Sequence, residues 1–133
     1  MNQTKIDNIC DVDAGTLVSS AENLVKKIKN ENKVLGTHQV RNVYSQIDQI
    51  KMELKGNNDD DNINHQITRL LFLKPKLAYA EARKSAVKPL RQAIEELIDQ
   101  LDELDNPERR RKGLTNFLHY MEAVVAYHKF HIK

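Results

Sequence analysis

Apolar residues recur at intervals of three and four positions along most of the chain, beginning at Leu17. This spacing places them on one face of an α-helix, so the pattern predicts amphipathic helices that bury that face. The first helix should run from Leu17 into a polar linker at residues 30–36, and the second from Thr37, a suitable N-cap, to Gly56. Their apolar stripes are Leu17, Ala21, Leu24, Val25 and Ile28, and Val40, Val43, Tyr44, Ile47, Ile50 and Leu54.

The segment before this pattern has a different character. Residues 1–13 are mostly polar and show no helical period. We therefore expect residues 1–13 to form a flexible or loosely docked N-terminal tail that carries no weight in the fold, and residues 14–133 to form one helical bundle domain.

A solvated loop and a proline define the middle of the chain. The run from Gly56 to Asn62 has no apolar residue, and its acids lack the downstream Gly and Glu that a calcium-binding loop needs at fixed offsets. A third helix is expected from about Asn62 to Ala86. Pro75 removes one backbone donor within it, so the helix either kinks near residues 72–74 or restarts at Pro75, and a kink is favoured.

Prolines also mark the starts of the last two predicted helices. Pro89 should open the fourth helix, which ends at Asp105, and Asn106 should cap a fifth helix that begins at Pro107 and nearly reaches the C-terminus. The predicted fold class is therefore all-α, a single-domain bundle of about five helices with the third kinked near Pro75. The apolar stripe of the fourth helix comprises Leu90, Ala93, Ile94, Leu97, Ile98, Leu101 and Leu104. The stripe of the fifth helix comprises Leu114, Phe117, Leu118, Met121, Val124, Val125 and His128.

Composition agrees with one modest domain. The chain has 133 residues, 40% of them hydrophobic, with only four Gly and three Pro. Cys10 is the single cysteine and cannot form an internal disulfide, and neither a leader nor an apolar run of about 18 residues is present, so we expect a cytoplasmic protein. The net charge of +2 (21 basic minus 19 acidic residues) is too small to indicate nucleic-acid binding by itself.

Motifs for catalysis are missing from the sequence. There is no Gly-rich phosphate loop, no Cys pair, no H-E-x-x-H and no Gly-x-Ser-x-Gly, so we expect no enzyme activity and no cofactor. His128 and His131 lie three positions apart, but the sequence indicates no third ligand for a metal. We expect no metal site; His128 should close the core stripe, while His119 and His131 should be solvated.

Acidic residues recur along the expected fourth helix and at its C-terminal end. Because the opposite side of that helix is Leu and Ile, we interpret them as a solvated face that would repel RNA and could meet a basic protein partner. They are Glu95, Glu96, Asp99, Asp102, Glu103, Asp105 and Glu108.

Basic residues concentrate between Gln66 and Arg91. Seven bases stand against one acid, Glu81, which gives a local excess of +6 (seven minus one). Such a strip often serves only solubility, but it also suits a phosphate backbone, and with few exposed aromatics expected, backbone contact is favoured over sequence-specific readout. Arg69, Lys76 and Arg83 are spaced seven residues apart, which places them on one side of a helix. Lys84, Lys88 and Arg91 are spaced four and three residues apart, and Lys74 is the seventh basic residue of the segment.

Two stretches carry a family resemblance. RLLFLKPKLAYAEARKSAVKPL (69–90) and FLHYMEAVVAYHKF (117–130), with a weaker match at residues 40–42, resemble the small subunit of type III-A CRISPR effector complexes, the Csm small-subunit family. The resemblance covers about residues 37–130. Ala82 departs from the family pattern, which often has Gly before the Arg that matches Arg83, and so adds a methyl group at that helix face.

The resemblance implies a non-enzymatic subunit, present in several copies, that contributes to antiviral defence. It would line the path of target RNA beside the backbone subunits that hold the guide RNA, with those RNAs, other Csm subunits and copies of itself as partners, and with no membrane or small-molecule substrate. The alternative is a helical protein-protein adaptor without direct RNA contact. The residues implied in RNA contact are Arg41, Arg69, Lys74, Lys76, Arg83 and Lys88, to which spacing alone adds Lys84 and Arg91. Tyr79, Tyr120, Tyr127 and Phe130 also match and are expected to be packing residues.

Overall fold

The computed structural model describes the backbone of residues 6–30 and 37–131 and the side chains of residues 6–29 and 41–131. Within these ranges the chain forms five α-helices and a short 3-10 turn, so the prediction of an all-α bundle of five helices is confirmed. The elements are α1 (Ala14–Asn30), α2 (Thr37–Gly56), α3 (Asp60–Arg83), η1 (Ser85–Val87), α4 (Lys88–Glu103) and α5 (Pro107–His131).

Short polar side chains begin three of the helices. Asp13 accepts a hydrogen bond from the Thr16 amide before α1, with 2.6 Å between Oδ1 and N, and this bond lowers the pKa of the Asp13 carboxyl. Asp59 accepts from the Asn62 amide at 2.8 Å, so α3 begins slightly earlier than predicted. Asn106 accepts from the Glu108 amide at 2.8 Å, which confirms the predicted cap of α5. The predicted cap at Thr37 lies outside the described side chains.

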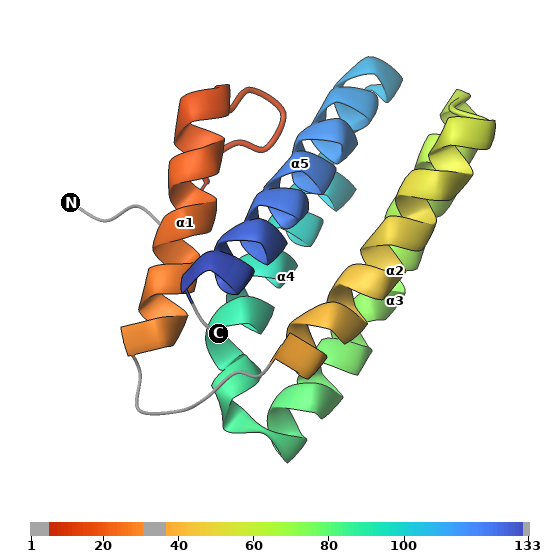
Figure 1. Cartoon of the computed structure of the whole chain (residues 1–133). Coiled ribbons are helices and arrows are strands. Elements are labelled where there is room, and N and C mark those ends of the chain that lie inside the picture. Colours follow the sequence, from red (N-terminus) through yellow and green to blue (C-terminus); the bar gives the residue numbers. More distant parts are fainter. Residues whose placement is uncertain (1–5, 31–36, 132–133) are drawn as a thin grey trace.

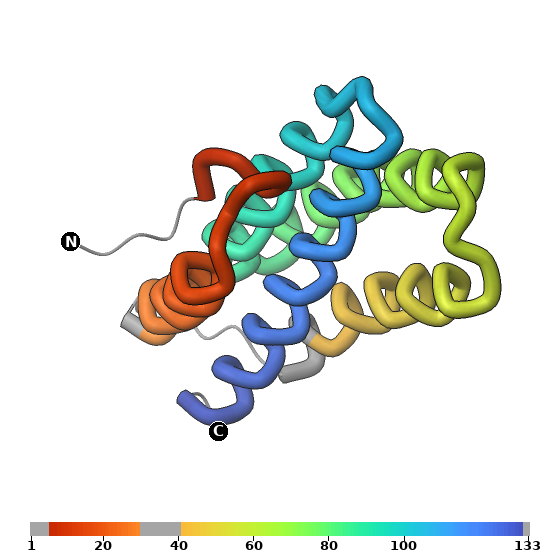
Figure 2. Tube along the Cα trace, turned by 90° about the horizontal axis from the view of Figure 1, so that it is seen from above, coloured from red at the N-terminus to blue at the C-terminus, as the bar shows by residue number. Residues whose placement is uncertain are grey.

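Helix α5 forms the centre of the bundle. It contacts each of the other four helices, and in Figure 1 it runs between α1 on one side and α2 on the other. Figure 2 shows the same arrangement from above, with α2 and α3 joined at one end by the loop that precedes Asp60. A broad buried face makes this central position possible. It comprises Gly113, Leu114, Phe117, Leu118, Tyr120, Met121, Val124 and His128.

Residues 6–13 dock on the ends of α4 and α5. Ile6, Ile9 and Cys10 are buried, and the Gln100 side chain bonds the segment's backbone twice, donating to the Ile6 carbonyl at 2.7 Å and accepting from the Ile9 amide at 2.7 Å. Asn116 donates to the Ile9 carbonyl at 2.8 Å. The expectation that the tail over residues 1–13 carries no weight in the fold is therefore wrong for residues 6–13.

Gly113 allows this end of the bundle to close tightly. A Cβ atom at position 113 would lie 2.9 Å from Leu101 Cδ2 and 3.0 Å from Leu104 Cδ1, with Ile9 Cγ2 at 3.5 Å. A larger residue at this position would require the Leu101 and Leu104 side chains to move, whereas Gly allows the end of α4 to pack directly against α5. The close approach completes the core around Ile9.

Helix α3 continues through Pro75. Pro75 lies inside one helix that spans Asp60–Arg83, so a restart at this proline is excluded, while the expected kink stays a prediction. The helix ends earlier than the predicted Ala86, because Lys84 adopts an extended backbone (φ −146°, ψ 101°). The 3-10 turn then buries Ala86 and Val87 and leads into α4.

Candidate nucleic-acid interface

Lys76 and Arg83 are the predicted cations that α3 presents most openly. Both side chains are exposed, and neither forms an ion pair with any acid in the described part of the chain. Arg69, seven residues before Lys76, is half-buried and bonded to Glu53 of α2, with 2.6 Å between Nη1 and Oε2. Hydrogen bonds from Gln66 and then Arg69 lower the pKa of the Glu53 carboxyl. The predicted stripe therefore forms, with its first charge partly neutralised.

Two other predicted cations are held by acids. Lys74 donates to Asp99 of α4 at 2.6 Å, and this bond raises the pKa of the Lys74 ammonium. Arg91 bonds Glu81 of α3 and, at 3.1 Å, Glu95 of α4. About a quarter of each of the Arg91 and Glu81 side chains is exposed, so this pair joins α3 to α4 near the surface. Both cations therefore link helices, and less of their charge faces solvent.

The second predicted stripe is not continuous. Lys84 lies beyond the end of α3, and Lys88 is the first residue of α4, so Lys84, Lys88 and Arg91 do not share one helix face as their spacing predicted. Lys84 and Lys88 are nevertheless both exposed, next to the 3-10 turn that follows Arg83. Positive charge thus continues from the end of α3 onto the start of α4.

The surface beside Lys76 is concave. A hollow of about 140 Å³ between α2 and α3 is lined by Arg69, Phe72 and Lys76 on α3 and by Gln46 and Ile50 on α2. A second hollow of about 210 Å³ shares Gln46 and Lys76 and extends toward Asn42. Arg41, the remaining candidate, is exposed on the same helix as Asn42.

Three aromatic side chains project from the surface, two of them against expectation. Tyr79 is 66% exposed and Phe130 is 70% exposed, so the expectation that they are packing residues is wrong. Tyr120 is fully buried and Tyr127 is half-buried, as expected. Phe72, which the sequence reasoning did not select, is 68% exposed. The sequence did contain a signal, because Phe72 and Tyr79 fall outside the helical face that carries the apolar residues Ile67, Leu70 and Leu77.

The acidic residues lie mainly on an exposed surface. Asp99, Asp102, Glu103, Asp105 and Glu108 are exposed, which confirms the predicted solvated face for these five. Glu95 and Glu96 are half-buried instead. Asp99 is not free, because it holds Lys74.

The histidines do not assemble a metal site in the described residues, where no group of three potential ligands comes together. His128 is buried and His119 is exposed, as predicted. His131 is not solvated as expected, because its Nε2 lies 2.9 Å from Glu22 Oε2 of α1 and only 16% of its side chain is exposed. The last turn of α5 is thereby joined to α1.

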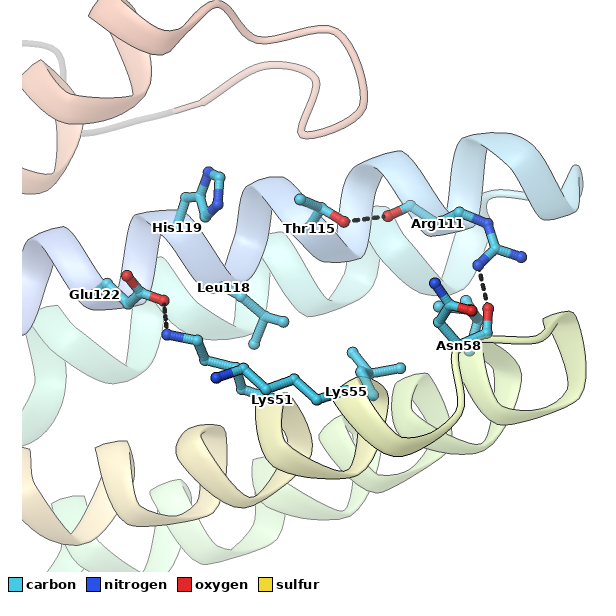
Figure 3. A pocket seen from close by; sticks show the side chains of 10 residues that line it. Lys51, Lys55, Asn58, Arg111, Thr115, Leu118, His119 and Glu122 are labelled. Carbon is cyan, nitrogen blue, oxygen red and sulfur yellow. Dashed lines mark hydrogen bonds and ion pairs between the residues drawn. The ribbon is translucent and has the colours of Figure 1, made fainter.

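A further group of cations, which the spacing of charges along the chain did not predict, surrounds a hollow of about 420 Å³ between α2 and α5. Figure 3 shows Lys51 and Lys55 of α2 opposite Arg111 and Glu122 of α5. Lys51 donates to Glu122 at 2.5 Å, which raises the pKa of Lys51, and Arg111 bonds Asp60 at 2.6 Å. Acids thus hold two of these cations, and this group carries less open charge than Lys76 and Arg83.

Two further observations concern the exposure of Ala82 and the hydropathy of the helices. Ala82 is exposed, so its extra methyl group relative to Gly is not in the buried core. None of the helices in residues 6–30 and 37–131 has the length and apolar character of a membrane span.

Comparison with known proteins identifies relatives over most of the chain. A model of the family described as Csm2 Type III-A matches residues 11–133. The CRISPR system Cms protein Csm2 of Streptococcus thermophilus is 30% identical over 117 residues, which are 86% of this chain and 89% of that protein. No solved structure matches the chain. The resemblance at residues 69–90 and 117–130 is confirmed, and the match also takes in α1, which that resemblance left out.

Proposed function

The chain belongs to the Csm2 type III-A family, and from this premise we propose that it is a non-catalytic small subunit of a type III-A CRISPR ribonucleoprotein effector, the Csm complex. In this proposal several copies line the path of the target RNA beside the guide RNA, and their partners are these RNAs, other Csm subunits and one another. The complex acts in the cytoplasm in antiviral defence. The subunit itself positions RNA and performs no reaction.

One observation carries the proposed RNA contact. Lys76 and Arg83 stand seven residues apart on one face of α3, exposed, with no acidic partner among the described residues. Unpaired ammonium and guanidinium groups in a row are the chemistry that a phosphate backbone recognises, because each contact releases a counterion from the nucleic acid. Lys84 and Lys88 extend this charge beyond the end of α3.

The candidate residues divide into two groups by their environment. We propose Arg41, Lys76, Arg83, Lys84 and Lys88 as the primary contacts to RNA phosphates. Arg69, Lys74 and Arg91 are proposed as secondary contacts, since a cation bonded to a carboxylate offers less net charge to a phosphate. Their main effect in this view is to hold α2, α3 and α4 together beneath the primary cations.

Salt dependence of RNA binding tests the proposal. The unmodified full chain should bind single-stranded RNA with an affinity that falls steeply as salt is raised. Replacing Lys76, Arg83 and Lys88 together with Ala should reduce the slope of log affinity against log salt by about 2, at roughly 0.7 for each lost phosphate contact. The matched control replaces Lys26, Lys27 and Lys29, three exposed lysines of α1, and so removes the same charge elsewhere.

The result also decides between RNA contact and the adaptor alternative. Equal slopes for both triple variants would mean that the basic face does not touch RNA, and would favour a helical adaptor whose cations meet an acidic protein surface. Turnover of RNA by the isolated chain in the presence of a metal ion would contradict the non-catalytic role.

A further inference from the structure

The exposed face of α3 alternates cations with aromatic rings. Arg69, Phe72, Lys76, Tyr79 and Arg83 follow one another at steps of three and four. At 3.6 residues per turn, these positions fall within an arc of about 80° on the helix. From this arrangement we propose that Phe72 and Tyr79 stack on the bases of unpaired nucleotides while the neighbouring cations hold the phosphates.

This inference rests on the proposed function and specifies its ligand. Phosphate contacts alone would accept any nucleic acid backbone, whereas aromatic faces require bases that are free to leave a duplex stack. The proposed ligand is therefore RNA with unpaired, splayed bases. Stacking tolerates any sequence, because each base has a flat face.

The exposure of the two rings supports a binding role. Phe72 is 68% exposed and Tyr79 is 66% exposed, on a helix whose opposite face buries Leu70, Leu73 and Leu77. Large aromatic surface left in water is a feature of binding sites, since burying it against a ligand is favourable. The backbone positions of Phe72 and Tyr79 are about 10 Å apart along the helix axis, so each ring has room for its own base.

Local geometry joins each ring to a cation. Phe72 borders the hollow of about 140 Å³ that Arg69 and Lys76 also line, so a base against this ring would have its phosphate near a positive side chain. The Arg83 guanidinium carbon lies 5.8 Å from the centre of the Tyr79 ring. This cation-π contact keeps the charge beside the ring. A base stacked on Tyr79 would therefore bring its phosphate toward Arg83.

The charge of the stripe favours RNA over a protein partner. The one acid between residues 66 and 91 is Glu81, which is bonded to Arg91, so no free carboxylate in this segment would oppose a phosphate. A protein partner would need an acidic surface with apolar pockets spaced to receive both rings. Attachment to such a surface, including the acidic face of a second copy, is an alternative outcome of the test.

The test separates bases from backbone. The full chain is titrated with a single-stranded uridine oligonucleotide and with an abasic sugar-phosphate oligomer of equal length. Unmodified protein should bind the uridine oligomer roughly tenfold or more tightly than the abasic one. Phe72→Leu/Tyr79→Leu should abolish this preference while leaving abasic binding and the salt slope unchanged. Phe130→Leu is the control, because Phe130 is 70% exposed on α5, apart from the stripe.

Each outcome has a distinct meaning. Salt-dependent binding with equal affinity for both oligomers, or an unchanged preference in the double variant, would overturn the stacking proposal and leave the proposed function standing. Absence of salt-dependent binding to either oligomer would overturn both. Loss of self-association in the double variant, measured by sedimentation, with RNA affinity retained, would assign the rings to contacts between copies and also overturn stacking.

Discussion

Lys74 of α3 reaches across to Asp99 of α4, and its Nζ lies 2.6 Å from the Asp99 Oδ1. This bond joins two helices that meet through their buried faces, at a position where the sequence alone offers only a lysine in a basic run. The bond makes Lys74 different from Lys76, because Lys76 has no acidic partner in the described part of the chain.

Replacing Lys74 and Lys76 one at a time should therefore have different effects. Lys74→Ala should lower the free energy of unfolding by about 0.2–1 kcal/mol, the usual range for a partly exposed ion pair, and should change RNA affinity little. Lys76→Ala should leave stability nearly unchanged and weaken RNA binding. Urea denaturation measures the free energy of unfolding of each variant, and titration with RNA at one salt concentration measures its affinity. Equal losses of RNA affinity in the two variants would show that Lys74 leaves Asp99 to contact RNA.

The helices could be predicted because their signals are local. Asn106 followed by Pro107 identifies the start of α5, and Asn106 does cap the Glu108 amide. The apolar repeat from Leu90 to Leu101 likewise places the buried face of α4 correctly. Each of these signals depends on neighbours within one or two helical turns, which is the range over which a sequence pattern determines backbone structure.

The pairing of charges could not be predicted in this way. Arg69 meets Glu53, 16 positions earlier, and Lys74 meets Asp99, 25 positions later. These distances depend on how the helices rotate against one another, which spacing along one helix does not determine. As a result, spacing along the chain predicted that Arg69, Lys76 and Arg83 share one side of α3, but which of the cations are free and which are paired came only from the structure.

The docked N-terminal segment was missed for the same reason. Ile6 and Ile9 are too few to show a period, and their partners Gln100 and Asn116 lie more than 90 positions away. Polar side chains that bond a passing backbone leave no pattern in the sequence. The consequence is a part of the core that depends on amide side chains.

Gln100→Ala tests how firmly this segment is held. The change removes the donor to the Ile6 carbonyl and the acceptor for the Ile9 amide, leaving both backbone groups without these bonds, so the free energy of unfolding should fall by about 1–3 kcal/mol. Urea denaturation measures the loss, and amide hydrogen exchange at Ile9 should accelerate. Gln92→Ala, an exposed glutamine on the same helix, is the control. Equal stability of the two variants would indicate that Gln100 contributes nothing to docking.

Tyr120 presents the opposite case, a buried polar group without a bond. Its side chain is fully buried, and its hydroxyl has no hydrogen-bond partner within the described part of the chain. Removing an unsatisfied buried hydroxyl while keeping the ring should stabilise the fold, so Tyr120→Phe should raise the free energy of unfolding by about 1 kcal/mol at neutral pH. Tyr127→Phe is the control, because Tyr127 is only half-buried and should change little. Destabilisation by Tyr120→Phe would mean that the hydroxyl has a partner in solution.

Alkaline pH provides an independent readout of the same residue. Burial raises the pKa of the Tyr120 phenol well above its ordinary value of 10.0, so the folded protein keeps this proton when the unfolded chain loses it. Above about pH 10 the unfolded state binds fewer protons than the folded state, and stability should fall as pH rises. Tyr120→Phe removes this contribution, so its stability should decline less steeply between about pH 10 and 12 than that of the unmodified protein. Urea denaturation over this pH range measures the free energy of unfolding of both proteins. If that free energy fell equally in the unmodified protein and in Tyr120→Phe, the phenol would ionise in the folded state as easily as in the unfolded chain.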